Sequence, residues 1–300
     1  MRQPNSEAES HPGNCLTVAF QGEHGAFSEL AARELLGESV ATLPNRKFEE
    51  MFDSVSTGRA DCAIVPIENS LAGSVHQNYD LMMQHELTVI GETYVRVVHN
   101  LIGAPGVSLA DVRRAHSHPV ALAQCTKFFK ANPRIEPEAA YDTAGSVKMV
   151  LESGAAGDAA IGSRLAAQTY GGQILAAGIE DNAKNFTRFL LLVRPERAAE
   201  IKVRPAIDQR KTSIVFRVAN KPGALFKALA VFALRDIDLA KIESRPIEGR
   251  PWEYSFYLDL GGDWLDPGIQ KALGHLSEMA ESVRVLGSYP LANIAAAADS

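Results

Sequence analysis

A hydroxyl and a guanidinium lie side by side at the start of an apolar run near residue 190. The chain reads Asn185-Phe186-Thr187-Arg188-Phe189 and continues with four large apolar residues. Such a run is typical of a strand buried on both faces, and in open α/β sheets ligands bind at strand ends. A hydroxyl can donate a hydrogen bond and a guanidinium can bind a carboxylate, so this segment is the first candidate for chemistry.

Further polar clusters lie where expected strands end and expected helices begin. They are Gly22-Glu23-His24-Gly25 with Ser28, Glu68-Asn69-Ser70, His116-Ser117-His118, and Asp142-Thr143-Ala144-Gly145-Ser146. Because ligands in such sheets bind beyond the carboxyl ends of the strands, we expect these clusters to meet in one crevice. The candidate binding residues are Ser28, Glu68, Asn69, Ser70, Ser117, Thr143 and Ser146. Helix capping or cleft architecture is the competing explanation for several of them.

Short β-rich runs alternate with helical patterns between residues 16 and 193. We expect strands at 16–20, 61–66, 112–116 and 138–141, followed by helices at 26–36, 74–84, 121–131 and 145–152. This alternation predicts an α/β fold with parallel strands and crossover helices.

A second unit follows residues 195–211, which carry prolines and charges without a clear period and are expected to form a linker. Its expected elements are a strand at 212–219, a helix at 224–234, strands at 239–247 and 253–260, a helix at 268–280 and a strand at 283–288. The order βαββαβ is the ferredoxin-like arrangement. Residues 1–14 are expected to be a flexible N-terminal segment, and residues 292–300 a tail.

Charge and composition restrict the classes of function. Lys and Arg number 30 against 36 Asp and Glu, a net charge of −6. A nucleic-acid partner would require a basic patch, so none is expected. An anionic small molecule must then be held by local Arg side chains or by backbone N–H groups at helix starts.

Apolar runs indicate the cellular location of the protein, and the number and spacing of the cysteines indicate the redox state of the thiols. The polar segment 1–14 lacks the apolar stretch of a signal peptide, and no run is long enough to cross a bilayer, so we expect a cytoplasmic protein with no membrane partner. Cys15, Cys62 and Cys125 are odd in number and form no Cys-x-x-Cys pair, which predicts reduced thiols.

No metal and no organic cofactor is expected. Gly22 and Gly25 lack the Gly-x-Gly-x-x-Gly spacing of a dinucleotide site and are expected to form a tight turn. His116 and His118 have no acidic or Cys partner at a recognisable spacing and are interpreted as loop residues that cap a helix.

Together these motifs resemble the prephenate dehydratase family. Thr187-Arg188-Phe189 matches the family's Thr-Arg-Phe hallmark, and three further segments match in the family's order: Val65-Pro66-Ile67-Glu68-Asn69-Ser70, Gly223-Ala224-Leu225-Phe226 and Glu243-Ser244-Arg245-Pro246. The resemblance covers nearly the whole chain. It implies a catalytic region over 15–194 of the periplasmic-binding-protein-like type. Its two lobes, 15–95 plus 186–194 and 96–185, would enclose a cleft, and a regulatory ACT domain would occupy 212–291.

The activity that this resemblance implies is the conversion of prephenate to phenylpyruvate in phenylalanine biosynthesis. Thr187 would donate a hydrogen bond or a proton to the leaving hydroxyl. Arg188 would either bind the pyruvyl carboxylate or hold the Thr187 strand through a structural salt bridge. Asn185 and Phe189 complete the expected substrate contacts.

The same resemblance implies feedback regulation by L-phenylalanine. The residues expected at that site are Asn220, Gly223, Ala224, Leu225, Phe226, Glu243, Ser244, Arg245 and Pro246. A lone βαββαβ unit has an open sheet edge, and ACT modules usually pair, so we expect a homodimer or homotetramer with the effector between chains.

Two alternatives remain at this stage. The segments 21–28 and 74–80 also resemble plant-type arogenate dehydratases, whose substrate carries an amino group in place of the keto group. A cytoplasmic amino-acid sensor without catalysis is the rival from another class, and it is disfavoured because binding alone does not require Thr187.

Overall fold

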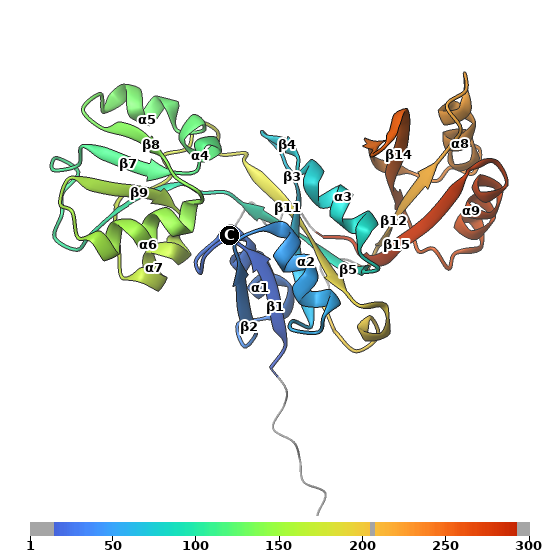
Figure 1. Cartoon of the computed structure of the whole chain (residues 1–300), viewed down its shortest axis with the longest axis horizontal. Coiled ribbons are helices and arrows are strands. Elements are labelled where there is room, and N and C mark those ends of the chain that lie inside the picture. Colours follow the sequence, from blue (N-terminus) through green and yellow to red (C-terminus); the bar gives the residue numbers. More distant parts are fainter. Residues whose placement is uncertain (1–14, 205–207, 293–300) are drawn as a thin grey trace, which may run out of the picture.

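Three sheets, each with its own helices, lie in a row along the longest axis of the molecule (Figure 1). The computed structural model describes residues 15–204 and 208–292. The flexible segment expected over 1–14 and the tail expected beyond Ala292 lie outside the described residues. The fold class expected from the sequence, a two-lobed α/β region followed by a βαββαβ domain, is confirmed.

The first lobe occupies the middle of the row. Its sheet has the order β2-β1-β3-β11-β5, with β4 paired to β3. The strands are β1 (Thr17–Gln21), β2 (Ala41–Asn45), β3 (Cys62–Asn69), β4 (Gly73–Ser74), β5 (Thr88–Arg96) and β11 (Phe186–Val193). Its helices are α1 (Phe27–Leu36), α2 (Phe48–Ser56) and α3 (His76–Gln84).

Strand β11 departs from the expected parallel arrangement. β1 is parallel to β2 and β3, whereas β11 runs antiparallel between β3 and β5. The prediction of parallel strands was therefore wrong for β11. The antiparallel direction places the first residues of β11 at the edge where β1 and β3 end, and this brings Thr187 opposite Asn69.

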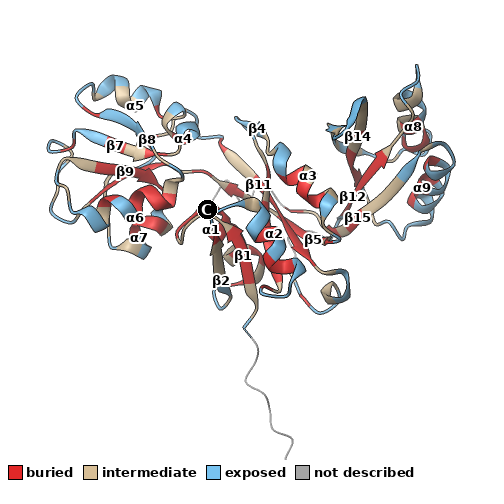
Figure 2. Cartoon of the chain, in the orientation of Figure 1, coloured by how far each residue is buried: buried red, intermediate tan, exposed pale blue. Residues whose placement is uncertain are grey.

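The apolar run of β11 is buried on both faces, as the sequence predicts. Leu191 and Val193 pack with α1 in one core cluster, while Leu190 and Leu192 pack with residues of α2 and α3 in another. Alternating side chains of a strand point to opposite faces, so a continuous apolar run suits a strand covered on both sides. Figure 2 shows this buried centre between the two outer bodies.

The second lobe has the sheet order β10-β6-β9-β7-β8. Its strands are β6 (Asn100–Gly103), β7 (Arg114–Ser117), β8 (Glu136–Ala139), β9 (Asp158–Gly162) and β10 (Gln173–Ala176). Its helices are α4 (Pro119–Ala123), α5 (Thr126–Ala131), α6 (Thr143–Ser153) and α7 (Arg164–Tyr170). The single helix expected at 121–131 is wrong, because the chain breaks between α4 and α5 at Gln124 and Cys125.

The chain passes between the lobes twice at one place. It enters the second lobe after β5 and returns before β11. The two passages are joined by a hydrogen bond from the Val97 N–H to the Asn185 carbonyl at 2.8 Å. The second lobe is thus a continuous segment inserted between neighbouring strands of the first.

The C-terminal domain follows a short 3-10 helix, η1 (Pro195–Arg197). It contains β12 (Arg210–Arg217), α8 (Ala224–Ala233), β13 (Leu239–Ile247), β14 (Arg250–Gly261), α9 (Pro267–Met279) and β15 (Ser282–Pro290). The sheet order β13-β14-β12-β15 confirms the ferredoxin-like arrangement. β12 begins at Arg210, so the last residues of the expected linker belong to the sheet.

The two faces of this sheet have different partners. One face packs under α8 and α9 through residues such as Ile214, Phe216 and Leu258. The other face packs on the first lobe, where Tyr257 and Tyr289 join its core cluster. The backbones approach closely at Gly287, where a side-chain Cβ would lie 2.0 Å from the carbonyl oxygen of Val89.

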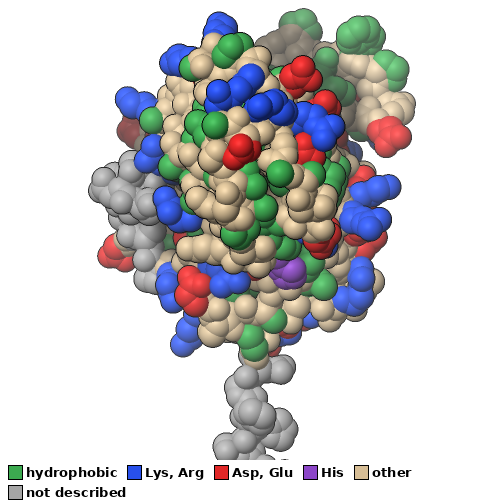
Figure 3. Space-filling view, turned by 90° about the vertical axis from the view of Figure 1, so that its left-hand side faces the viewer, with side chains coloured by type: hydrophobic (Ala, Val, Ile, Leu, Met, Phe, Trp, Pro, Cys, Tyr) green, Lys and Arg blue, Asp and Glu red, His purple; other side chains and the backbone are tan. Residues whose placement is uncertain are grey.

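Charges are mixed on the outer surface of the second lobe. Figure 3 shows basic and acidic side chains interspersed on the face turned to the viewer. In the described ranges, none of the helices has the length and hydropathy that a membrane span requires.

Candidate active site

A cavity of about 530 Å³ lies between the two lobes. Its polar and aromatic lining from the first lobe includes Gln21, Ser28, Phe48, Asn69, Ser74 and Thr187, and from the second lobe His99, His118, Gln124, Tyr141, Asp142 and Thr143. The strand ends and helix starts expected to form one crevice therefore do meet. This volume is typical of a site for a small organic molecule.

Thr187 lies on the cavity wall with its hydroxyl held by Asn69. Asn69 Nδ2 donates to Thr187 Oγ1 at 3.0 Å and to Asn185 Oδ1 at 2.8 Å. Asn69 Oδ1 accepts from the backbone N–H groups of Leu71 and Ala72, which fixes the orientation of the amide. Since Thr187 Oγ1 accepts this bond and has no other polar partner among the described residues, its own O–H can donate into the cavity.

A chain of amides continues from Asn69 to the second lobe. Buried Asn185 donates to Gln124 Oε1 at 2.9 Å, and the same oxygen lies 2.9 Å from His99 Nε2. A Gln oxygen can only accept, so His99 carries its proton on Nε2. His99 Nδ1 is buried without a hydrogen-bond partner in the described structure, and burial lowers the pKa of His99.

Helix starts from both lobes face the cavity. Ser28 lies in the first turn of α1, and Thr143 is the first residue of α6. Backbone N–H groups in a first helical turn have no partner within the helix and favour an anion. Asp142 caps α6 by accepting from Gly145 N–H, while its Oδ2 is buried without a partner in the described residues. Burial, together with the charge of Glu23, raises the pKa of Asp142.

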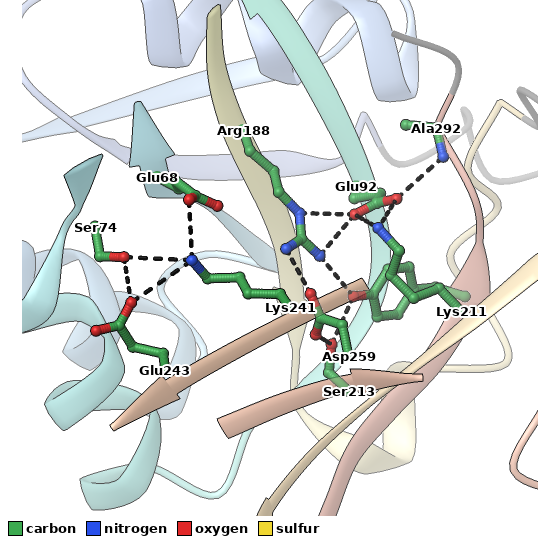
Figure 4. Close-up of polar contacts among 11 residues, drawn as sticks. Glu68, Ser74, Glu92, Arg188, Lys211, Ser213, Lys241, Glu243, Asp259 and Ala292 are labelled. Atoms are coloured by element: carbon green, nitrogen blue, oxygen red, sulfur yellow. Dashed lines mark hydrogen bonds and ion pairs between the residues drawn. The ribbon is translucent and has the colours of Figure 1, made fainter. Parts of the chain in front are cut away.

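Arg188 does not line the cavity, so its expected contact with substrate is not supported. Neighbouring residues of a strand point to opposite faces, and Arg188 points away from Thr187. Its guanidinium contacts Glu92 at 2.7 Å, Asp259 of the C-terminal domain, and Tyr289 Oη at 3.1 Å (Figure 4). Burial opposes its charge, but Asp259 and its other neighbours raise the pKa of Arg188. The alternative interpretation, a structural salt bridge, describes this geometry.

Several other expected substrate contacts are also corrected. Phe189 is in the apolar core, and Ser117 and Ser146 are buried with their hydroxyls bonded to the carbonyls of Ile161 and Asp142. Glu68 points to the C-terminal domain and pairs with Lys241 at 3.0 Å. Ser70 is exposed, and its hydroxyl donates to the Lys184 carbonyl and accepts from the Phe186 N–H. Of the substrate-binding candidates, Ser28, Asn69 and Thr143 line the cavity and Asn185 supports Asn69, while their contact with substrate stays a prediction.

The expected effector residues do not form one surface in this chain. Asn220, Ala224 and Leu225 line a small cavity of about 90 Å³ with Tyr254 and Phe256. Gly223 begins α8 in the left-handed conformation, with φ 77°. Phe226 is 76% exposed.

The segment Glu243-Ser244-Arg245-Pro246 is divided between the two faces of β13. Glu243 bonds Ser74 and Arg245 pairs with Asp80 at 2.7 Å, both across the junction with the first lobe. Ser244 and Pro246 are paired in register with Phe256 and Tyr254, which line the small cavity. Because side chains alternate along a strand, Glu243 and Arg245 contact the first lobe in this chain, and the expected contacts of the four residues with the effector stay a prediction.

His116 and His118 lie apart from any metal-like cluster in the described part of the chain. His116 is 3.7 Å from Asp158, and His118 accepts from Val120 N–H at the start of α4. In the described residues, three or more His, Cys, Asp or Glu side chains do not gather in a way that could hold a metal ion. Cys15, Cys62 and Cys125 are free thiols.

Three cavity residues, His99, Gln124 and Tyr141, are not among the candidates that the sequence indicates. His99 follows Val97 and Val98 just beyond β5, a strand that was not expected, and a polar residue directly after such apolar residues was the available signal. Gln124 lies at the break between α4 and α5, where a continuous helix was expected. Tyr141 was assigned to a strand but is 62% exposed beside the cavity and contacts Glu23 across the cleft at 3.3 Å.

Comparisons with known proteins agree with this geometry. The family model for prephenate dehydratase matches residues 18–197, and that for the ACT domain matches residues 212–274. A chloroplastic arogenate dehydratase/prephenate dehydratase from Arabidopsis thaliana is 43% identical over 93% of this chain and 74% of its own length. Arogenate dehydratase 2 from Petunia hybrida is 42% identical over 93% of this chain and 72% of its length.

Solved structures include two with a TM-score of 0.82. One is prephenate dehydratase from Arthrobacter aurescens in complex with L-Phe, 33% identical, covering 92% of this chain and 90% of that chain. The other is described as a novel type of quorum-quenching acylase, 37% identical, covering 93% of this chain and 99% of that chain. Through its catalytic region, its C-terminal domain and its curated relatives, the chain belongs to the prephenate dehydratase family.

Proposed function

We propose that the chain converts prephenate to phenylpyruvate in the cavity between the lobes, with Thr187 assisting the departure of the ring hydroxyl. The observation that carries this proposal is the Thr187 hydroxyl on the cavity wall, which accepts from Asn69 and keeps its own hydrogen for a ligand. A hydroxyl that accepts a hydrogen bond becomes a better donor, because bonds in a chain polarise one another.

The reaction needs little beyond orientation and one well-placed donor. The carboxylate on the quaternary ring carbon leaves as CO2, its bonding electrons enter the ring, and the hydroxyl at the opposite carbon leaves with its bonding pair. The departing hydroxide takes up a proton to become water, and the ring becomes aromatic. A threonine hydroxyl is a weak acid, so preorganised hydrogen bonding to the departing oxygen is its main contribution.

The substrate carboxylates are held by helix starts in this proposal. Neither Lys nor Arg lines the cavity among the described residues. The first turn of α1 supplies backbone N–H groups near Ser28, and α6 supplies the N–H of Thr143 from the opposite lobe, beside the Gly145 N–H that is bonded to Asp142. Binding the anion from both sides also closes the lobes around it, which excludes water from the reacting ring.

Arogenate is the second candidate substrate, since it differs only by an amino group on the side chain. The names of the curated relatives include arogenate dehydratases. The test is an assay with each substrate separately, measuring phenylpyruvate from prephenate and phenylalanine from arogenate, for the native chain and Thr187→Val. We expect prephenate turnover that Thr187→Val lowers by roughly two orders of magnitude or more. Turnover of neither substrate, or equal turnover by Thr187→Val, would contradict the proposal.

An acylase activity is not favoured by the cavity. Amide hydrolysis by a covalent route requires a nucleophile beside a general base. Among the described cavity residues, His99 contacts Gln124 and His118 accepts from a backbone N–H, so neither is hydrogen-bonded to a hydroxyl there. The sensor without catalysis is set aside because the curated relatives are enzymes.

L-Phenylalanine is proposed as the effector of the C-terminal domain, bound at the turn before α8. The first turn of α8 supplies N–H groups for a carboxylate. The adjoining cavity of about 90 Å³ is much smaller than typical ligand sites. A second copy of the chain is therefore proposed to complete the site.

Self-association of the C-terminal domain has support in its exposed apolar residues. β13 is an edge strand of its sheet. Phe226, Leu234, Ile242 and Trp252 are between 46% and 82% exposed on this domain. An open edge beside exposed apolar side chains is typical of a pairing surface. A homodimer or homotetramer and a cytoplasmic location stay predictions.

A further inference from the structure

Thr187 and Arg188 are neighbours on β11 that face two different sites. Thr187 faces the cavity, and Arg188 is 5% exposed at the junction with the C-terminal domain. Arg188 contacts Glu92 on β5 of its own lobe and Asp259 on β14 of the C-terminal domain. The residue that follows Thr187 is therefore held jointly by the two domains.

The junction around Arg188 is a balanced and almost fully bonded polar cluster. Lys211 pairs with Glu92 at 2.8 Å, so two cations face two carboxylates (Figure 4). Ser213 donates to the second oxygen of Asp259 and lies 2.6 Å from Tyr289 Oη, which also bonds Arg188. Directional bonds of this kind fix one relative position of the strands, which apolar packing alone does not do.

The pairing of β11 is irregular at this point. Arg188 pairs in register with Glu68, while Phe189 pairs with Pro66, so β3 contains an extra residue between them. Bulges bend a strand and re-aim the side chains beside them. The contacts of Arg188 therefore hold β11 at a point where its pairing with β3 is interrupted, one residue from Thr187.

A second contact links the same C-terminal sheet to the cavity rim. Lys241 on β13 contacts Glu68 at 3.0 Å and Ser74 Oγ at 3.3 Å, and Ser74 also bonds Glu243 (Figure 4). Ser74 lines the cavity. The C-terminal sheet therefore contacts the first-lobe side of the cavity at two places.

We propose that Arg188 is a positioning residue for Thr187, and that it fixes the Thr187 hydroxyl only while Asp259 of the C-terminal sheet holds it. The proposal rests on the proposed function for its kinetic consequence. A change in the C-terminal sheet that shifts Asp259 then moves the hydroxyl relative to the substrate. Substrate binding at the helix starts is unaffected, so the effect falls on kcat rather than on KM.

The test uses Asp259→Asn in the full chain, because this variant keeps the side-chain volume and leaves the catalytic residues intact. We expect kcat to fall by about ten- to a hundredfold with KM little changed, the scale of a small misplacement of a reacting group. Arg188→Lys, which keeps the charge and loses the two-pronged contact, should reproduce this loss. Asp263→Asn is the control, since Asp263 pairs with Arg210 near the end of the same sheet. It should leave both constants unchanged.

An NMR measurement makes the test independent of turnover. In a chain with labelled threonine methyl groups, the Thr187 signal is identified by its absence in Thr187→Ser. We expect this signal to shift in Asp259→Asn and to stay in place in Asp263→Asn. An unmoved Thr187 signal, or an unchanged kcat beside a lowered melting temperature, would mean that the cluster is only structural and would overturn the proposal. Absence of turnover in the native chain would contradict the proposed function instead, and the NMR shift would then decide this inference alone.

Discussion

Asn69 Nδ2 lies 3.0 Å from Thr187 Oγ1, and the same amide nitrogen lies 2.8 Å from Asn185 Oδ1. The two asparagines are 116 residues apart in the sequence, and the antiparallel pairing of β11 with β3 brings them together. Asn69 thereby holds the hydroxyl as an acceptor. The O–H of Thr187 is left free to donate into the cavity.

Replacement of Thr187 should separate chemistry from folding. Thr187→Val removes the hydroxyl and keeps the shape, so kcat should fall by roughly two orders of magnitude or more, the scale of losing one preorganised donor. Thr187→Ser keeps the hydroxyl and should retain most of the activity. Steady-state kinetics and thermal unfolding of both variants check this. Near-normal turnover by Thr187→Val would show that the hydroxyl is not needed.

The stability contributed by His99 should depend on pH. Burial lowers its pKa in the folded chain, while the unfolded chain titrates near the ordinary value of about 6.5. Below that pH the imidazole of His99 binds a proton in the unfolded state more readily than in the folded state, so the free energy of unfolding falls as the pH falls. The free energy of unfolding of the native chain, relative to His99→Gln, should therefore decrease from pH 8 to pH 5. Urea titrations at several pH values measure this difference, and a constant difference would contradict the burial of a neutral His99.

Gly287 should be required for docking of the C-terminal domain. A Cβ at this position would lie 2.0 Å from the Val89 carbonyl oxygen, so Gly287→Ala should force the two sheets apart. We expect a loss of about 1–3 kcal/mol, the usual cost of overpacking, seen as a lower melting temperature. Gly268→Ala is a control, because no atom lies within 4 Å of a Cβ there. Equal melting temperatures for the two variants would contradict the close approach.

Gly223 should be needed for the response to phenylalanine. Its φ of 77° is a left-handed conformation that a β-branched residue avoids, although a Cβ would meet no atom within 4 Å. Gly223→Val should therefore distort the turn by backbone strain rather than by crowding. Inhibition by phenylalanine should be lost while uninhibited turnover is nearly unchanged.

The matched control for Gly223 is Gly249→Val, in the turn between β13 and β14. Its φ of 73° is similar, and a Cβ would again meet no atom within 4 Å. Its inhibition curve should match that of the native chain. Full inhibition of Gly223→Val would place the effector elsewhere.

Local patterns predicted the fold class and the position of Thr187. An apolar run bounded by polar residues identifies a buried strand and its end, and both are properties of neighbouring residues. The structural role of Arg188 was harder to predict, because its partner Asp259 is 71 residues away and lies in another domain. The pairing direction of β11 likewise depends on where β3 and β5 lie in space, which periodicity does not contain.

Lys211 gives a second example of this limit. It lies in a proline-bearing, charged stretch without a period, which is typical of a linker. In the structure it is buried against Glu92 as part of β12. Charge in a sequence usually indicates exposure, and only the opposite charge of a distant strand makes its burial favourable.

The hydrogen bond between Val97 and Asn185 indicates where the chain could be divided into fragments. The chain leaves the first lobe and returns to it at adjacent positions, so residues 98–184 have neighbouring ends. A fragment with such ends can be produced alone, or its ends can be joined and the chain opened elsewhere, with little cost in loop closure. If residues 97 and 185 of the remaining chain are joined, mixing it with that fragment would rebuild the cleft from two pieces, and the affinity between the pieces would measure the contacts between the lobes.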